Sequence, residues 1–264
     1  MDLMLTQKVV AITGPAKGMG EAITRAFAAE GARLALLARD TEAVSVLAKE
    51  LGEQGIDVAL VACDITKPDQ CEQAVAHIRE ALGDLPDVLV NVAGGSGPVG
   101  KSGADTTFEE FEEIVRLNMS GCFNTMRAVL PGMMARRSGK IVNVGGTFGM
   151  RGKAGRMAYS ASKWGLRGIT KSMALEAGPY NVNINIVAPG MVDGQRFRSK
   201  VCPDMAARLG ISEEEAAQRH AEEYALQRIS TAQDIANACL FMASDCSRQI
   251  TGADLPVDGG WAAL

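Results

Sequence analysis

The chain has 264 residues, of which 47% are hydrophobic, so it can bury a full apolar core. Its 27 Lys and Arg residues against 31 Asp and Glu residues give a net charge of −4, and no long basic run favours nucleic acid as a partner. No apolar run is long enough to cross a membrane, and the N-terminus lacks the charged-then-apolar order of a signal peptide. We therefore expect a soluble, cytoplasmic protein that binds neither nucleic acid nor a membrane.

Cysteine and histidine usage argues against two further classes of protein. The 6 cysteines are scattered without paired spacing, and only 2 histidines are present. A disulfide framework or a zinc site needs clustered ligands. We therefore predict reduced cysteines and no metal centre.

The first motif joins an apolar strand, residues 8–13, to a helical pattern over residues 21–30. Between them lie Gly14, Gly18 and Gly20. Glycines allow a tight turn and a close backbone approach, and a helix N-terminus attracts a pyrophosphate. An ordinary strand–helix turn with incidental glycines is the alternative, and the flanking elements make it less favoured. The sequence predicts a phosphate-binding loop here.

A second strand, residues 33–38, ends in a pair of residues that bears on the choice of cofactor. Where an acidic residue would bind the 2′-hydroxyl of NAD, the chain has Ala38 followed by Arg39. The planar guanidinium of Arg39 can pair with a 2′-phosphate instead, and Lys17 adds a second cation. Two solvated surface cations are the alternative. We predict a preference for NADP(H), with NAD(H) as the other possibility.

The next two strands also end in polar or glycine-rich turns. Asp64 follows strand 57–62, where it can accept from an adenine amino group or cap the next helix. Asn91 and Gly94 follow strand 88–90. Because ligands bind at the carboxyl edge of an open parallel sheet, these turns belong to the same predicted site.

The second half of the chain continues the alternation of strands and helices. A long amphipathic helix is predicted from residue 106 or 107 to about 135, with Asn118 in its middle. Segment 191–227 is a long, partly helical excursion at the ligand edge, and such segments are usually lids or binding loops. The other predicted elements are helices 42–51, 68–82 and 232–244 and strands 139–144, 182–188 and 253–257. We predict one α/β domain over residues 1–264, a Rossmann-type, doubly wound parallel sheet with helices on both faces.

Tyr159 and Lys163 are four residues apart in a helical pattern, so they lie one turn apart on the same face. A lysine ammonium held near a phenol favours the phenolate, which suits a tyrosine to general acid–base work. The pair alone is weak, because the same spacing occurs on many solvated helices.

With these residues laid out, the chain resembles the short-chain dehydrogenase/reductase family over essentially its whole length. No single motif is specific, but their order is. The matching residues are Thr13-Gly14-x-x-x-Gly18-x-Gly20, Asp64, Asn91-x-Ala93-Gly94, Asn118, Tyr159-x-x-x-Lys163, Pro189-Gly190 and Val257-Asp258-Gly259-Gly260.

The resemblance implies a seven-stranded parallel sheet, a nicotinamide cofactor and a homotetramer. It implies that Tyr159 exchanges a proton with the substrate oxygen, that Lys163 holds the nicotinamide ribose, and that Asn118 anchors a relay water. The cofactor contacts it implies are Thr13, Gly14, Lys17, Gly18, Met19, Gly20, Arg39, Cys63, Asp64, Ile65, Asn91, Ala93, Gly94, Tyr159, Lys163, Pro189, Gly190 and Val192.

Three positions depart from the family pattern. Gly146 stands 13 residues before the tyrosine, where the family has a serine that polarises the substrate oxygen. Thr147, the next residue, is our candidate substitute donor, although neighbours on a strand point to opposite faces. Val92 replaces an asparagine and Gly194 a threonine. Neither is expected to abolish cofactor binding.

The predicted substrate site lies between the loop after Gly146 and the excursion after Gly190. Six cations occur in these two segments, a field that would steer an anionic substrate: Arg151, Lys153, Arg156, Arg196, Arg198 and Lys200. Solvated loop charges or subunit contacts are the alternative. We select Gly146, Phe148, Arg151, Arg196 and Phe197 as substrate residues, with core packing as the alternative for the two phenylalanines.

The leading functional hypothesis is an oxidoreductase that moves a hydride between NADP(H) and a secondary alcohol or ketone, with a 3-oxoacyl-thioester reductase as the nearest variant. The second is a cofactor-binding protein with little or no redox activity, which Gly146 favours. The third is non-redox elimination or isomerisation on the same fold.

Overall fold

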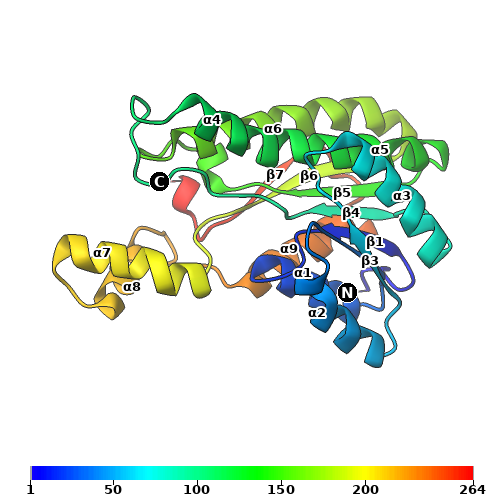
Figure 1. The fold of residues 1–264 in the computed structure, drawn as a ribbon, viewed down its shortest axis with the longest axis horizontal. Helices are drawn as coiled ribbons and strands as arrows, with labels where there is room; N and C mark the ends of the chain where they lie inside the picture. Colours follow the sequence, from blue (N-terminus) through cyan, green and yellow to red (C-terminus); the bar gives the residue numbers. More distant parts are fainter. Residues whose placement is uncertain (1, 264) are drawn as a thin grey trace.

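The computed structural model describes residues 2–263, which are organised around a seven-stranded, all-parallel sheet in the order β3-β2-β1-β4-β5-β6-β7 (Figure 1). This confirms the predicted fold class. The strands are β1 (Val9–Thr13), β2 (Arg33–Ala38), β3 (Val58–Ala62), β4 (Val88–Asn91), β5 (Gly139–Val144), β6 (Val182–Pro189) and β7 (Asp254–Val257).

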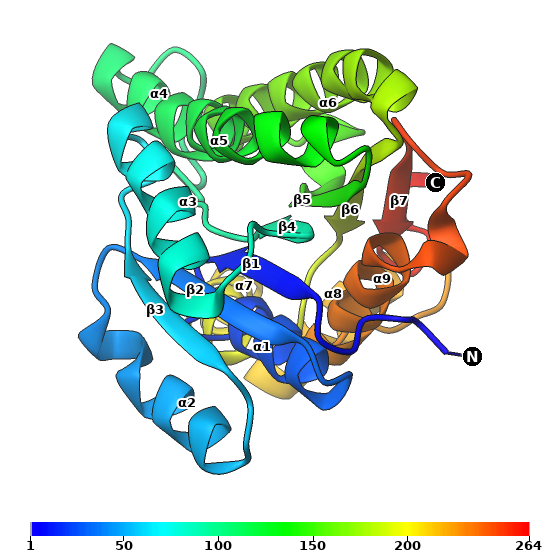
Figure 2. The ribbon, with the colours of Figure 1, turned by 90° about the vertical axis from the view of Figure 1, so that its right-hand side faces the viewer.

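Helices cover both faces of the sheet (Figure 2). One layer contains α1 (Met19–Ala29), α2 (Glu42–Glu53) and α9 (Ala232–Ala243). The opposite layer contains α3 (Pro68–Leu82), α4 (Phe108–Val115), α5 (Gly121–Ala135) and α6 (Met157–Ala177). None of the helices in residues 2–263 has the length and apolar character needed to span a bilayer.

Helices on both faces of the sheet explain why its central strands are mostly apolar. All five residues of β1 are buried. Val10 and Ile12 face the layer that contains α1 and α9, whereas Val9 and Ala11 face the layer that contains α3 and α5. Successive strand residues point to opposite faces, so a sheet covered on both sides needs apolar residues at every position.

The long helix predicted over residues 106–135 is not uniform. Thr107 caps α4, and its hydroxyl and the Glu110 carboxylate form a reciprocal capping box. A π-helical turn over Arg116–Ser120 then separates α4 from α5, and Asn118 is its central residue. The helix is continuous from Phe108 to Ala135, as predicted, but the sequence did not indicate the π-helical turn within it. Short π-helical insertions are frequent at functional sites.

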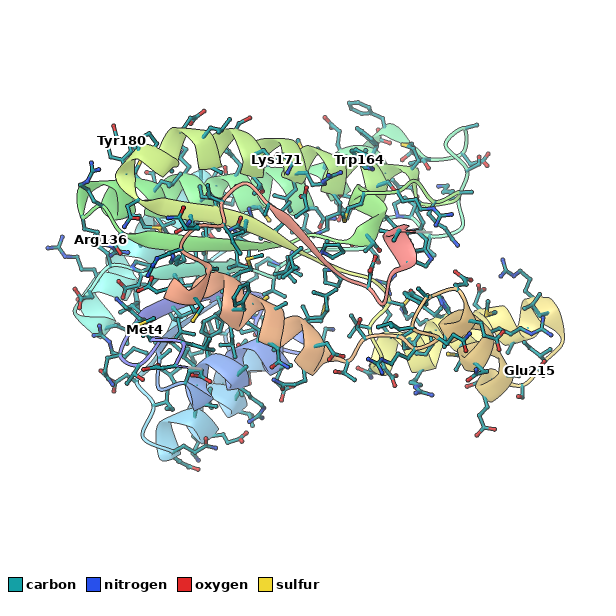
Figure 3. All side chains as sticks on the ribbon, turned by 180° about the vertical axis from the view of Figure 1, so that it is seen from behind. Met4, Arg136, Trp164, Lys171, Tyr180 and Glu215 are labelled. Atoms are coloured by element: carbon teal, nitrogen blue, oxygen red, sulfur yellow. The ribbon has the colours of Figure 1, made fainter. Side chains whose placement is uncertain are left out.

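The strand order reverses at β1, which lies between β2 and β4. Because all of the strands are parallel, the turns after β1, β4, β5 and β6 lie at the same edge of the sheet. The excursion after β6 projects beyond that edge as α7 (Cys202–Leu209) and α8 (Glu213–Glu222), with Glu215 far from the sheet (Figure 3).

The stem of the excursion is tied to its other end. Val192 forms a parallel bridge with Ser230, and the Met191 backbone N–H donates to the Tyr224 hydroxyl at 3.0 Å. Burial raises the pKa of Tyr224 to about 12, so this hydroxyl stays protonated at neutral pH. The excursion is therefore anchored where it leaves and rejoins the sheet.

Candidate active site

Tyr159 and Lys163 lie in the first two turns of α6 and face the end of β5. The Lys163 ammonium is 6% exposed and donates to the Val144 carbonyl at 2.9 Å. Its Nζ lies 5.8 Å from the centre of the half-buried Tyr159 ring. No carboxylate in residues 2–263 forms an ion pair with Lys163.

Asn118 is fully buried and ties the turn after β4 to α6. Its Oδ1 accepts from the Gly95 N–H at 2.8 Å, and its Nδ2 donates to the Gly95 carbonyl and to the Ser162 hydroxyl, each at 3.0 Å. Ser162 in turn donates to the Tyr159 carbonyl at 2.7 Å. The π-helical turn therefore places Asn118 next to the Tyr159 helix. The sequence did not single out Ser162.

Gly146 lies directly opposite the Tyr159 hydroxyl. A Cβ atom built on Gly146 would lie 2.8 Å from that oxygen. The Gly146 backbone is extended, so only this contact, and no backbone strain, opposes a side chain here. Thr147 starts the 3-10 turn Thr147–Gly149 and is 3% exposed. No residue among 2–263 hydrogen-bonds its hydroxyl.

The glycine turn between β1 and α1 leaves room for a phosphate. A Cβ on Gly20 would lie 2.0 Å from the Gly14 carbonyl oxygen, and one on Gly14 would lie 2.8 Å from the Ala93 Cα, so both positions require glycine. Gly18 has a φ of 58° and no atom within 4 Å of its ideal Cβ position. A group can therefore approach the backbone there and meet the N-terminus of α1, which fits a dinucleotide pyrophosphate.

Two predicted cofactor residues form the floor of this groove. The Thr13 hydroxyl accepts from the Val92 and Ala93 N–H groups, both at 3.1 Å. The Asn91 amide donates to Asn143 at 2.9 Å and accepts from the Thr125 hydroxyl at 2.8 Å. Their side chains bond to other parts of the protein and shape the groove from below.

The ends of β2 and β3 present a cation and an anion side by side. Arg39 is exposed and Asp64 half-buried. Partial burial opposes ionisation of Asp64, but hydrogen bonds from Thr66 and the charge of Arg39 outweigh it and hold its pKa below the ordinary value. Cys63 and Ile65 are buried on either side of Asp64. Lys17 is exposed at the glycine turn.

The remaining predicted cofactor residues line the same edge. Met19 is the half-buried first residue of α1. Gly94 adjoins the Asn118 amide, whose oxygen would lie 2.9 Å from an added Cβ. Pro189 is buried at the end of β6, and Gly190 has no space for a side chain beside Asp258 and Tyr224.

Aromatic and cationic side chains cover the substrate side of Tyr159. The Phe148 ring meets Tyr159 edge-on at 6.2 Å and Trp261 at 5.3 Å. Arg151 lies over the Trp261 ring at 5.0 Å and donates to the Trp261 carbonyl at 3.2 Å. Trp261 was missed from the sequence, because it comes from a C-terminal turn 102 positions after Tyr159.

The predicted substrate residues and cations of segment 191–227 differ in burial and in pairing. Arg196 is exposed, and no carboxylate in residues 2–263 pairs with it. Phe197 is 1% exposed and packs inside the excursion against His220, with ring centres 5.5 Å apart. Its position matches the core-packing alternative. Arg198 pairs with Asp193, and Lys153 pairs with Glu223.

Comparisons with known proteins agree with this geometry. Residues 8–204 match the family described as short chain dehydrogenase. The trans-4-hydroxycyclohexanecarboxylate dehydrogenase of Sinomonas cyclohexanicum is 34% identical over 267 residues, covering 98% of this chain and 94% of the relative. The 3-oxoacyl-(acyl-carrier-protein) reductase of Escherichia coli is 32% identical over 255 residues, 96% of each chain.

A solved structure of a relative supports the same assignment. A 3-oxoacyl-(acyl-carrier protein) reductase with bound NAD from Brucella melitensis superposes with a TM-score of 0.83 at 29% identity, covering 97% of this chain and 92% of that one. The chain therefore belongs to the short-chain dehydrogenase/reductase family and is an NAD(P)-dependent oxidoreductase that acts on CH–OH or keto groups.

Proposed function

We propose that this enzyme interconverts a secondary alcohol and a ketone, with NADP(H) as the cofactor and Tyr159 as the acid–base group. The observation that carries the proposal is the pairing of Tyr159 with a buried Lys163 that has no carboxylate partner among residues 2–263. A phenol beside a buried cation at this edge of the sheet can give a proton to a substrate oxygen or take one from it.

Each residue of the centre has a defined task. Tyr159 donates its proton to the oxygen of a ketone during reduction and removes it from an alcohol during oxidation. Lys163 would provide a positive charge beside the Tyr159 ring and would hold the nicotinamide ribose. NADP(H), when bound, supplies or accepts the hydride. Phe148 and Trp261 exclude water from one side of Tyr159.

The geometry changes the role that we assign to Asn118. Its two amide protons are engaged by Gly95 and Ser162 and its oxygen accepts from Gly95, so only the second lone pair of that buried oxygen is left for a water. We propose that it holds the loop after β4 against α6. A relay water would bind a backbone carbonyl of the π-helical turn, where the hydrogen-bond register is shifted.

The preference for NADP(H) rests on Arg39 and Lys17. Both are exposed beside the glycine turn or the end of β2, and neither pairs with a carboxylate within residues 2–263. A guanidinium and an ammonium here match a 2′-phosphate, whereas NAD would leave them without a partner. NAD remains the alternative, because the Brucella melitensis relative carries it.

The two curated relatives define the substrate alternatives. One relative is named for a hydroxy carboxylate and the other for a 3-oxoacyl thioester. The hydroxyl group of the first compound can be oxidised, and the keto group of the second can be reduced. A 3-oxoacyl thioester is therefore the nearest variant of our proposal. Segment 191–227 would act as the substrate lid of a single domain. The family resemblance also supports a cytoplasmic homotetramer.

The test follows the absorbance of NADPH against a panel of ketones and oxoacyl thioesters. Wild type and Tyr180→Phe should turn over the same substrates, since Tyr180 lies at the far end of α6 (Figure 3). Tyr159→Phe should lose roughly 10²–10⁴-fold in kcat, the usual contribution of a general acid–base group. Wild type that binds NADPH but turns over nothing in the panel would favour a cofactor-binding role instead.

A further inference from the structure

Arg156 is the residue immediately before α6, three positions ahead of Tyr159. Its guanidinium carbon lies 4.8 Å from the centre of the Tyr159 ring and 5.7 Å from the centre of the Phe148 ring. One of its terminal nitrogens donates to the Ser96 carbonyl at 3.1 Å. The cation is therefore stacked within the active site, on the side of Tyr159 covered by Phe148.

The charge on Arg156 is not compensated inside the protein. Its Nε is buried and has no hydrogen-bond partner. No carboxylate in residues 2–263 lies within ion-pair distance of it, whereas the comparable Arg167, stacked on Trp164, pairs with Asp254 at 2.9 Å. Burying a charge without an opposite charge is costly, so buried cations are normally paired.

Arg196 increases this excess of positive charge. Burial lowers the pKa of Arg156, the Tyr159 phenol opposes that shift, and the charge of Arg196 adds to it. Arg196 comes from the excursion after β6 and is exposed. The charge of Arg196 therefore adds to that of Arg156, and neither arginine forms an ion pair with a carboxylate within residues 2–263. A bound anion at the terminal nitrogens of the half-buried Arg156 would offset this positive charge.

The cofactor is a poor candidate for this anion. Its phosphates belong at the glycine turn and at Arg39, which follow β1 and β2. Arg156 instead lies at the start of α6, next to the 3-10 turn that follows β5. The groups that meet there are Phe148, Tyr159 and Ser96, which are on the substrate side.

We propose that Arg156, assisted by Arg196, binds a carboxylate of the substrate, so that the enzyme acts on short hydroxy acids and oxo acids. The guanidinium fork accepts a carboxylate in bidentate geometry. Because the fork stacks on the Tyr159 ring, the reacting carbon is only a few bonds from the acid group. This inference rests on the proposed function of Tyr159.

The experiment measures kcat/KM with NADPH for pairs of oxo acids and their methyl esters. The two members of a pair share the ketone and differ in the charge of the acid group. Arg156→Gln should lower the acid-to-ester ratio roughly 10- to 100-fold, the range for hydrogen bonds to a charged group. Arg156→Lys, which keeps the charge but not the fork, should give a smaller loss, mainly in KM. Oxo sulfonates form a third arm that distinguishes a carboxylate site from a general oxyanion site.

Arg198→Gln is the matched control, because Arg198 is on the same excursion but already pairs with Asp193 at 2.6 Å. It should leave the acid-to-ester ratio unchanged. A ratio that stays constant in Arg156→Gln, while both rates fall together, would overturn the inference and leave the proposed function intact. It would mean that Arg156 only supports the Tyr159 ring.

A binding arm separates the inference from catalysis. Calorimetry on Tyr159→Phe protein loaded with NADP should show tighter binding of the acid than of the ester. Adding Arg156→Gln to this background should remove the difference. If the difference appears but wild type turns over neither compound, the proposed function fails while the anion site stands. Equal binding of acid and ester to the Tyr159→Phe protein would overturn the anion site.

Discussion

Replacing Gly146 by alanine tests whether the Tyr159 hydroxyl needs the space that the glycine leaves. The new Cβ would lie 2.8 Å from that oxygen, against an ordinary contact of 3.4 Å or more, so the hydroxyl must move by about 0.6 Å. A misplacement of about 1 Å can reduce a rate 10²-fold. A shift of this size is therefore expected to lower kcat on the order of tenfold.

Gly146→Ser separates the effect of space from the effect of the missing donor. Serine adds the same Cβ as alanine and also a hydroxyl that can donate to the substrate oxygen. One such donor is worth roughly 10²–10³-fold in kcat. We therefore expect kcat of Gly146→Ser to exceed that of Gly146→Ala by about 100-fold. The assay is NADPH consumption at saturating substrate, with Gly152→Ala as the control because nothing lies within 4 Å of its ideal Cβ position.

The role of the Thr147 hydroxyl determines how the kcat of Gly146→Ser is interpreted. If its hydroxyl already donates to the substrate, Thr147→Val should lower kcat in wild type but much less in Gly146→Ser. Equal kcat for the alanine and serine variants, both near wild type, would refute the reasoning. That result would show that the Tyr159 hydroxyl neither needs the space at residue 146 nor benefits from a donor there.

Two further predictions concern the cofactor and stability. Arg39→Asp should reduce the preference for NADPH over NADH about tenfold or more in titrations of each cofactor. The new carboxylate would repel a 2′-phosphate and would accept a hydrogen bond from a 2′-hydroxyl. An unchanged preference would exclude Arg39 as the phosphate contact. Burial opposes ionisation of Asp254, but its hydrogen bonds to Arg167 and Lys171 outweigh this and lower its pKa. Its stabilising contribution should be complete above the unfolded value of about 3.9 and be lost as the pH falls through the folded pKa. Urea unfolding of Asp254→Asn and wild type should therefore converge in acid, and a constant difference would contradict this.

The element boundaries were predictable where local chemistry marks them. Strand 33–38, helix 68–82 and strand 139–144 have the same bounds in the structure as in the prediction. Pro68 fits the first turn of α3, and Gly83 ends it in the left-handed conformation with a φ of 77°. Such signals need only neighbouring residues, so the sequence contains them directly.

The interior of the site depends on contacts that no local pattern encodes. The helix continues on both sides of the π-helical turn, so residues 106–135 read as one element in the sequence. Asn118, Ser162 and Gly95 come from three separate segments, and their hydrogen bonds exist only after α4 and α6 pack together. The resemblance to the family identified Asn118, but it could not show that both amide protons bond within the protein.

The cations near the substrate show the same difference between pattern and structure. Of the six, we selected Arg151 and Arg196 from the sequence, yet pairing and burial in the structure separate the cations differently. Arg198 and Lys153 have acidic partners, Arg196 is exposed, and Arg156 alone is stacked on Tyr159 with a buried, unpartnered Nε. Water screens an exposed charge far more than a buried one, so a carboxylate should gain more from Arg156 than from Arg196. We therefore expect Arg196→Gln to lower the acid-to-ester ratio of kcat/KM less than Arg156→Gln does. The opposite order would mean that the excursion closes over the substrate and buries Arg196 when the acid binds.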